Sequence, residues 1–232
     1  MLIALGIFDT KAIITDTIKI AKGENEVHEK NISEVYKHED GWGIAYLDSK
    51  NKWEVFKSIK PIFEDDTINE FRNLKTRALI IHVRRATRGK LSVENNQPFI
   101  IKRRDGEYLF VHNGTIYDQL NYSNNYLNTS DTDSAEWFNY IIGYMQQNKG
   151  YTKNILMKLN NFDAANFCLV TPMKIVIGEK YTKNPKYYSI KLHRGKSKFI
   201  VCSEILPTMR GARWERLANG SIIELPLIKY LF

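Results

Sequence analysis

RALIIHVRRATRG, residues 77–89, joins an apolar run to a strongly basic loop. The apolar and β-branched residues are typical of a buried strand, which we expect to end at Arg84. Two arginines directly after such a strand are either solvated surface charges or part of a binding site, since a guanidinium grips a carboxylate through two parallel hydrogen bonds. The stretch therefore predicts a strand that runs into a basic loop, and both interpretations of Arg84 and Arg85 stay open at this point.

The segments around this strand alternate between β-prone and helical patterns. The Asp105-Gly106 pair between two β-prone runs is a strong hairpin signal, and the Ser/Asp/Thr/Asp cluster from Ser130 is typical of a helix cap. We expect strands at Leu2–Phe8 and within 165–181, 187–194, 198–204 and 220–232, hairpins over 41–58 and 97–114, and helices over Asp9–Lys30, Glu64–Lys75 and 130–147.

Composition predicts one globular domain over residues 1–232, with 43% hydrophobic and 26% charged residues. The sequence has no run of roughly 18 apolar residues and no signal-peptide pattern, so we expect a cytoplasmic protein that does not enter a membrane. Cys168 and Cys202 lie in apolar runs and are expected to be buried thiols, with no disulfide, metal or cofactor. The net charge of +8 is scattered and accompanies no nucleic-acid-binding motif, so nucleic acid is not an expected partner.

Four segments place polar groups at the ends of apolar strands: residues 38–43 (HEDGWG), 82–89 (HVRRATRG), 111–116 (VHNGTI) and 130–134 (SDTDS). Each is a weak signal alone. In this order and spacing, with 94–99 (ENNQPF) and 202–206 (CSEIL), they resemble the glutaminase domain of class II glutamine amidotransferases, which are N-terminal-nucleophile hydrolases. The similarity runs from Leu5 to about Leu225 and is greatest to the small stand-alone branch. It implies an α+β fold, a four-layer αββα sandwich of two antiparallel sheets.

The resemblance also implies a pocket for glutamine or another γ-glutamyl small molecule. Arg84 would hold the substrate carboxylate, with Thr87 and Arg88 nearby, and Asp133 would accept the α-ammonium group. Asn113 and the backbone N–H of Gly114 would form an oxyanion hole. Asp133 could equally be a simple helix cap. His82 and His112 are expected to hold loops by hydrogen bonds, and residues 41–43 to pack closely around a buried Trp42.

The family's nucleophile is a cysteine exposed by removal of the initiator methionine, and its own α-amino group is the base. The alignment places Leu2 there, and leucine has no nucleophilic atom. Cys168 and Cys202 have the surroundings of core thiols, and processing to expose Thr10 would remove the first strand. Three explanations are open. The protein is an amidotransferase that has kept the fold and lost the reaction, or its cysteine was replaced deliberately, or the mature protein starts at a different residue from this sequence.

Two functions remain open from the sequence. The chain is either a glutamine amidohydrolase that supplies ammonia to a separate synthetase, through a thioester on a cysteine, or an inactive binding or assembly subunit of a larger complex. The retained pocket residues favour ligand binding in both cases. Fold alone does not decide between them.

Overall fold

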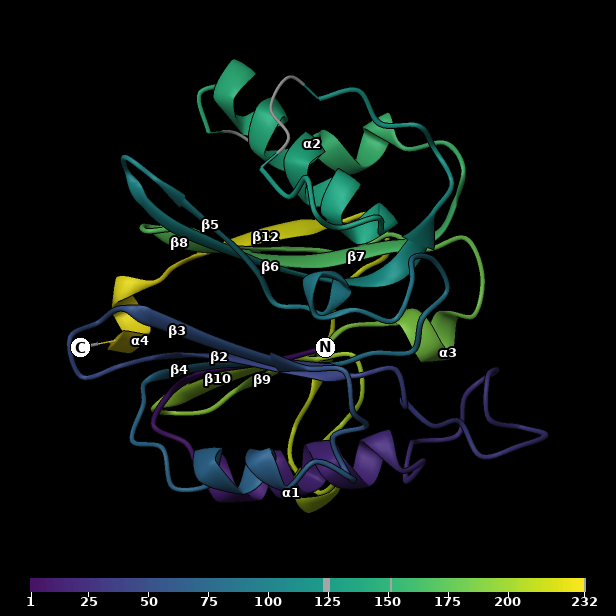
Figure 1. The fold of residues 1–232 in the computed structure, drawn as a ribbon, viewed down its shortest axis with the longest axis vertical. Coiled ribbons are helices and arrows are strands. Elements are labelled where there is room, and N and C mark those ends of the chain that lie inside the picture. Colours follow the sequence, from purple (N-terminus) through teal and green to yellow (C-terminus); the bar gives the residue numbers. More distant parts are fainter. Residues whose placement is uncertain (123–125, 151, 232) are drawn as a thin grey trace.

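The protein is a sandwich of two antiparallel β-sheets with helices on both outer faces (Figure 1). This computed structural model describes residues 1–122, 126–150 and 152–231, and all strand counts refer to them. The seven-stranded sheet has the order β11 (Glu215–Arg216), β9 (Lys191–Arg194), β10 (Lys198–Cys202), β1 (Leu2–Gly6), β4 (Ala78–Val83), β2 (Trp42–Leu47), β3 (Trp53–Ser58). The five-stranded sheet has the order β12 (Ile222–Pro226), β8 (Lys174–Gly178), β7 (Phe162–Val170), β6 (Gly106–Ile116), β5 (Phe99–Arg103).

The helices complete the four layers. In Figure 1, α1 (Thr10–Ala21) lies on the outer face of the seven-stranded sheet and α2 (Asp133–Gln147) on the outer face of the five-stranded sheet. The expected αββα sandwich is therefore confirmed. The shorter helical turns are α3 (Pro185–Tyr188), α4 (Ile228–Leu231) and the 3₁₀ turns η1 (Asp66–Phe71), η2 (Val93–Asn95), η3 (Ile155–Lys158) and η4 (Pro207–Met209).

Three apolar clusters fill the spaces between these layers. Alternate residues of β1 belong to two of these clusters, because successive side chains of a strand point to opposite faces of the sheet. Ile3 and Leu5 pack between the two sheets, whereas Leu2 and Ala4 pack toward α1. The third cluster joins the five-stranded sheet to α2. A central strand covered on both faces needs apolar residues at every position, which explains the uninterrupted run at the start of the chain.

Three expected elements have different bounds in the structure. The first helix ends at Ala21 rather than fraying toward Lys30, because Gly23 has a φ of +106° and closes the helix in a Schellman motif. The helix expected over 64–75 is only the 3₁₀ turn η1, whose buried residues are Ile68 and Phe71. So few apolar residues cannot form a helical stripe.

The third difference lies before β9. The β-prone run that begins at Tyr187 starts as α3 instead, because Pro185 supplies a fixed φ suited to the first helical position. Strand pairing starts only at Lys191. The hairpin over 97–114 is confirmed as β5 and β6, and Cys168 and Cys202 are buried on β7 and β10.

The pairing of β1 brings distant segments to one end of the sandwich. Leu2 lies opposite both Ile81 of β4 and Cys202 of β10. Because both pairings are antiparallel, the start of β1 meets the ends of β4 and β10. This end of the molecule carries most of the residues singled out by the sequence.

Within the described part of the chain, no helix has the length and apolar character that crossing a bilayer requires.

Candidate active site

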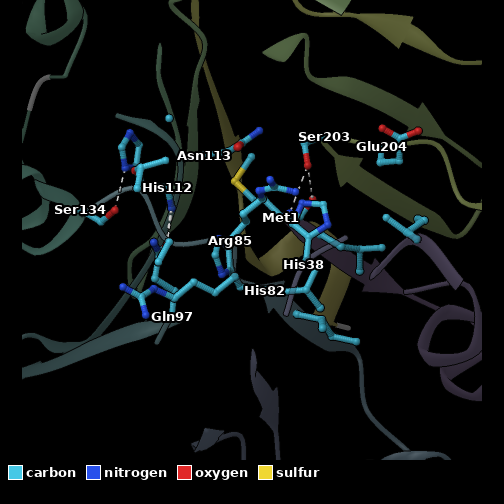
Figure 2. A pocket seen from close by; sticks show the side chains of 18 of the residues that line it. Met1, His38, His82, Arg85, Gln97, His112, Asn113, Ser134, Ser203 and Glu204 are labelled. Carbon is cyan, nitrogen blue, oxygen red and sulfur yellow. Dashed lines mark hydrogen bonds between the residues drawn. The ribbon is translucent and has the colours of Figure 1, made fainter. Parts of the chain in front are cut away.

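A cavity opens between the two sheets at the end where β1 begins (Figure 2). Its walls come from β1, β4, β6, the start of α2, the loop after α1 and the residues that follow β10. The side chain of Met1 extends into it toward Asn113, and the remaining volume is about 90 Å³. Ligand pockets usually measure roughly 300–1,000 Å³, so a ligand would have to displace this flexible thioether side chain.

Arg84 follows β4 and is buried in the wall of the cavity. Its guanidinium donates to the backbone oxygens of Arg88 (3.0 Å) and Lys90 (3.3 Å) and thereby shapes the loop after β4. Burial lowers the pKa of Arg84, opposed by the carboxylates of Asp40 and Asp133 among others. A guanidinium has five N–H donors, so donors remain for an anionic ligand.

Thr87 and Arg88 fasten the same loop to β6. The Thr87 hydroxyl lies 2.9 Å from that of Thr115, and Arg88 donates to the Ile116 oxygen at 2.9 Å. These side chains cross from the seven-stranded to the five-stranded sheet and hold one wall of the cavity.

Asn113 and Gly114 lie on β6, opposite Asn166 and Ala165 of β7. A Cβ atom added at Gly114 would lie 1.9 Å from the Ala164 oxygen, so only glycine fits there. The Asn113 side chain lies beside Met1 in the cavity (Figure 2).

Asp133 is the first residue of α2 and is buried. The cap of this helix is Thr132, whose hydroxyl accepts from the Ala135 N–H. The alternative in which Asp133 is the cap is therefore wrong. Its Oδ2 instead accepts from the Ile116 N–H at 2.7 Å, which ties the end of β6 to the start of α2.

The histidines hold the same region together. His112 Nδ1 lies 2.8 Å from the Ser134 hydroxyl, and the His112 backbone N–H donates to Gln97 Oε1 at 2.6 Å. These contacts match the loop-holding role expected for His112. The same role for His82 stays a prediction. The expected packing around the indole is also found, because Trp42 is fully buried and donates to Asp65.

Two histidines also present unused ring nitrogens. Among the described residues, Nδ1 of His38 and Nδ1 of His82 are buried without a hydrogen-bond partner, and both residues line the cavity. Burial is the largest cause of a lowered pKa in both, and the nearby N-terminal charge adds to it; together these effects lower the pKa of His38 to about 3. Both imidazoles are therefore neutral at pH 7. The sequence motif included His38 without giving it a role.

Leu2, where the family cysteine was aligned, lines the cavity but packs mainly in the cluster toward α1. Met1 is on the opposite face, against the cluster between the sheets. Its α-amino nitrogen donates to the Ser203 hydroxyl at 3.1 Å. Ser203 was recognised only as part of a motif, and the strand register needed to place it beside Met1 is not visible in one sequence.

Comparison with known proteins gives one consistent family. Residues 28–165 match the family model described as "Glutamine amidotransferases class-II". The chain is 31% identical over 115 residues to the "Putative glutamine amidotransferase" of Haemophilus influenzae, covering 47% of this chain and 38% of that protein.

Two solved structures share the fold. The glutamine phosphoribosylpyrophosphate amidotransferase of B. subtilis has a TM-score of 0.62 at 16% identity, covering 97% of this chain and 48% of that one. A "predicted glutamine amidotransferase" of Pseudomonas aeruginosa has a TM-score of 0.57 at 14% identity, covering 85% and 88%.

The chain matches less than half the length of three curated relatives, at 38%, 44% and 40% of their sequences. The family match spans more than half of this chain and includes the residues from His38 to Asp133 that build the cavity. The chain therefore belongs to the class II glutamine amidotransferases.

Proposed function

We propose that the cavity binds glutamine or another γ-glutamyl amide. The observation that carries the proposal is the convergence of Arg84, Asp133 and Asn113–Gly114, from three separate segments, on one cavity. In this assignment Arg84 binds the α-carboxylate, Asp133 the α-ammonium group, and Asn113 with the Gly114 N–H the amide oxygen. Thr87 and Arg88 hold the loop that carries Arg84.

The chemistry of the ligand explains why these groups belong together. Glutamine carries one anion, one cation and a neutral amide, so a selective site needs a fixed cation, a fixed anion and a hydrogen-bond donor. Buried charges are costly unless paired, and Arg84 and Asp133 would each gain a group of opposite charge when the ligand enters. Binding requires no nucleophile at Leu2, whereas hydrolysis to glutamate and ammonia does require one in the cavity.

A ligand panel tests the proposal without altering the protein. Calorimetric titration with glutamine is compared with γ-aminobutyramide, which lacks the α-carboxylate, and glutaramate, which lacks the α-ammonium group. We expect each analogue to bind at least about tenfold more weakly, since each leaves one buried charge unpaired.

Variants of the protein test which residue binds each charged group of glutamine. Asp133→Asn should weaken glutamine binding but leave glutaramate binding nearly unchanged, because glutaramate has no ammonium group to lose. Arg77→Ala, just before β4 and at the opposite end of that strand from Arg84, is the control that should bind like the unaltered chain. Equal affinity for all three ligands, or none for glutamine, contradicts the proposal and leaves the assembly-subunit alternative.

A further inference from the structure

Ser203 lies where the register of two strands brings a hydroxyl to the start of the chain. It directly follows β10, whose Cys202 pairs with Leu2 of β1. The Met1 nitrogen lies 3.1 Å from Ser203 Oγ, and the Ser203 N–H donates to the Met1 oxygen at 3.0 Å. An α-amino group and a hydroxyl are thus in direct contact.

This contact occurs within the proposed glutamine pocket. Met1, Ser203, Asn113 and Gly114 all line the same cavity. Figure 2 shows Asn113 and Ser203 on either side of Met1. A ligand in this cavity would therefore lie among Asn113, Gly114 and the Ser203 hydroxyl.

The surroundings of the Met1 amine keep it neutral. Burial lowers the pKa of this group to about 6, aided by Lys191 and opposed by Cys202 and Glu204. The His38 and His82 imidazoles, on the loop after α1 and on β4, line the same cavity as the amine and are uncharged. At pH 7 most Met1 amines therefore have a free lone pair that can accept a proton.

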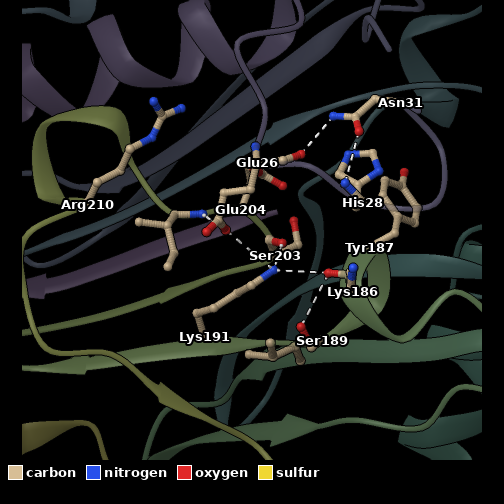
Figure 3. Close-up of polar contacts among 12 residues, drawn as sticks. Glu26, His28, Asn31, Lys186, Tyr187, Ser189, Lys191, Ser203, Glu204 and Arg210 are labelled. Atoms are coloured by element: carbon tan, nitrogen blue, oxygen red, sulfur yellow. Dashed lines mark hydrogen bonds and ion pairs between the residues drawn. The ribbon is translucent and has the colours of Figure 1, made fainter. Parts of the chain in front are cut away.

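A polar cluster fixes the Ser203 backbone (Figure 3). Lys191 is buried, and its Nζ donates to the Ser203 oxygen at 2.8 Å. The Glu26 carboxylate lies 4.0 Å from the same Nζ, and the Glu26 N–H donates to the Glu204 carboxylate. Burial raises the pKa of Glu204 to about 7. The backbone oxygen of Ser203 is thus bound by Lys191 and its N–H by Met1, which restricts the position of Ser203 relative to Met1.

We propose that Ser203 is the nucleophile of this protein for γ-glutamyl amide hydrolysis, with the Met1 α-amino group as its base. The inference rests on the proposed function, because it needs the amide bound in the cavity. It moves the nucleophile from residue 2 to the residue that follows the neighbouring strand β10, while an α-amino group still serves as the base.

The reaction balances with water as the only co-reactant. Ser203 Oγ attacks the γ-carbonyl carbon while its proton passes to the neutral Met1 amine, and the oxyanion is held by Asn113 and Gly114. The ammonium group then gives that proton to the departing nitrogen, which leaves as ammonia or an amine, and an ester remains on Ser203. Water attacks the ester, its proton passes through Met1, and glutamate departs with Ser203 restored.

The test measures glutamine binding, ammonia release and covalent labelling on the same preparations, after intact mass has verified a free Met1. We expect glutamate and ammonia release that Ser203→Ala lowers on the order of a thousandfold or more, while calorimetric glutamine binding is retained. Ser203→Cys should restore release. Ser197→Ala, just before β10 at its opposite end, should change nothing. A γ-diazoketone analogue of glutamine should lose N₂ and alkylate the Ser203 oxygen, located by peptide mapping.

The pH profile supplies a further readout. Release should rise about tenfold per pH unit below about pH 6, where the amine is protonated, and level off above it. Release that survives Ser203→Ala, or glutamine binding without any release or labelling, overturns the inference but leaves the proposed function intact. Absence of glutamine binding overturns both.

Discussion

At the scale of single residues, Gly114 is where one extra carbon should damage the site most. A Cβ atom would lie 1.9 Å from the Ala164 oxygen and 2.4 Å from its carbon, both backbone atoms that cannot rotate away. We expect Gly114→Ala to lower the free energy of unfolding by about 1–3 kcal/mol, measured by urea denaturation.

Gly143→Ala is the matched control. Gly143 lies in α2, and a Cβ atom added there would meet no described atom outside its own helix backbone within 4 Å. Alanine should therefore raise the free energy of unfolding by up to about 1 kcal/mol through its helix propensity. Equal effects of the two substitutions would show that β6 and β7 do not approach as closely as described.

The sequence alone singled out Arg84, Asn113, Gly114 and Asp133, and the structure brings them to one cavity. Their roles toward glutamine stay predictions. Ser203 could not be assigned a role, because its contact with Met1 spans 202 positions in the chain and depends on how β1 and β10 pair. Strand alternation likewise decides that Met1 rather than Leu2 faces the space between the sheets.

At the scale of elements, the start of α2 determines where Asp133 lies. The Thr132 hydroxyl accepts from the Ala135 N–H at 3.2 Å, satisfying one of the unpaired donors of the first turn. We expect Thr132→Ala to cost about 1 kcal/mol of unfolding free energy and to weaken glutamine binding by letting the first turn shift. Thr132→Ser keeps the hydroxyl and should restore both, as measured by urea denaturation and calorimetry. If alanine and serine behave alike, the cap does not position Asp133.

Elements marked by characteristic turn or cap residues in the sequence were predicted well. Elements whose bounds depend on the backbone conformation of one residue were not. The hairpin of β5 and β6 was marked by its turn, and α2 by its cap. The end of α1 depends on a left-handed Gly23, and the pattern of apolar residues up to Ala21 did not show that the helix closes there. The Tyr187–Tyr188 pair fits a strand by propensity, but Pro185 and the contacts of Glu29 with the Lys186 and Tyr187 N–H groups hold it as a helical turn.

At the scale of the whole molecule, Glu179 links the two sheets. It follows β8 of one sheet, and its fully buried carboxylate accepts from the N–H of Ile190, just before β9 of the other. Burial raises the pKa of Glu179 to about 7, against an ordinary value of 4.5. Between these values the unfolded chain loses this proton first, so the contribution of Glu179 to stability falls as the pH rises and is fully lost above about pH 7.

Glu179→Gln keeps an acceptor for Ile190 but cannot ionise. We expect the variant to gain unfolding free energy relative to the unaltered chain as the pH rises, on the order of 2 kcal/mol between about pH 5 and pH 8. Urea denaturation of both proteins at several pH values gives this difference. Groups that titrate alike in the two proteins cancel when one free energy of unfolding is subtracted from the other. A difference that does not change with pH would mean that Glu179 is ionised in the folded protein.

Recognition of glutamine by both of its charged ends, in the cavity between the sheets, is best tested by diffraction from crystals soaked with saturating glutamine. We predict that the ligand displaces the Met1 side chain. Its α-carboxylate should lie on the Arg84 guanidinium, its α-ammonium group on Asp133 and its amide oxygen on Asn113 and the Gly114 N–H. Glutamine bound in the reverse orientation or elsewhere on the protein, or a cavity still filled by Met1, would contradict this assignment.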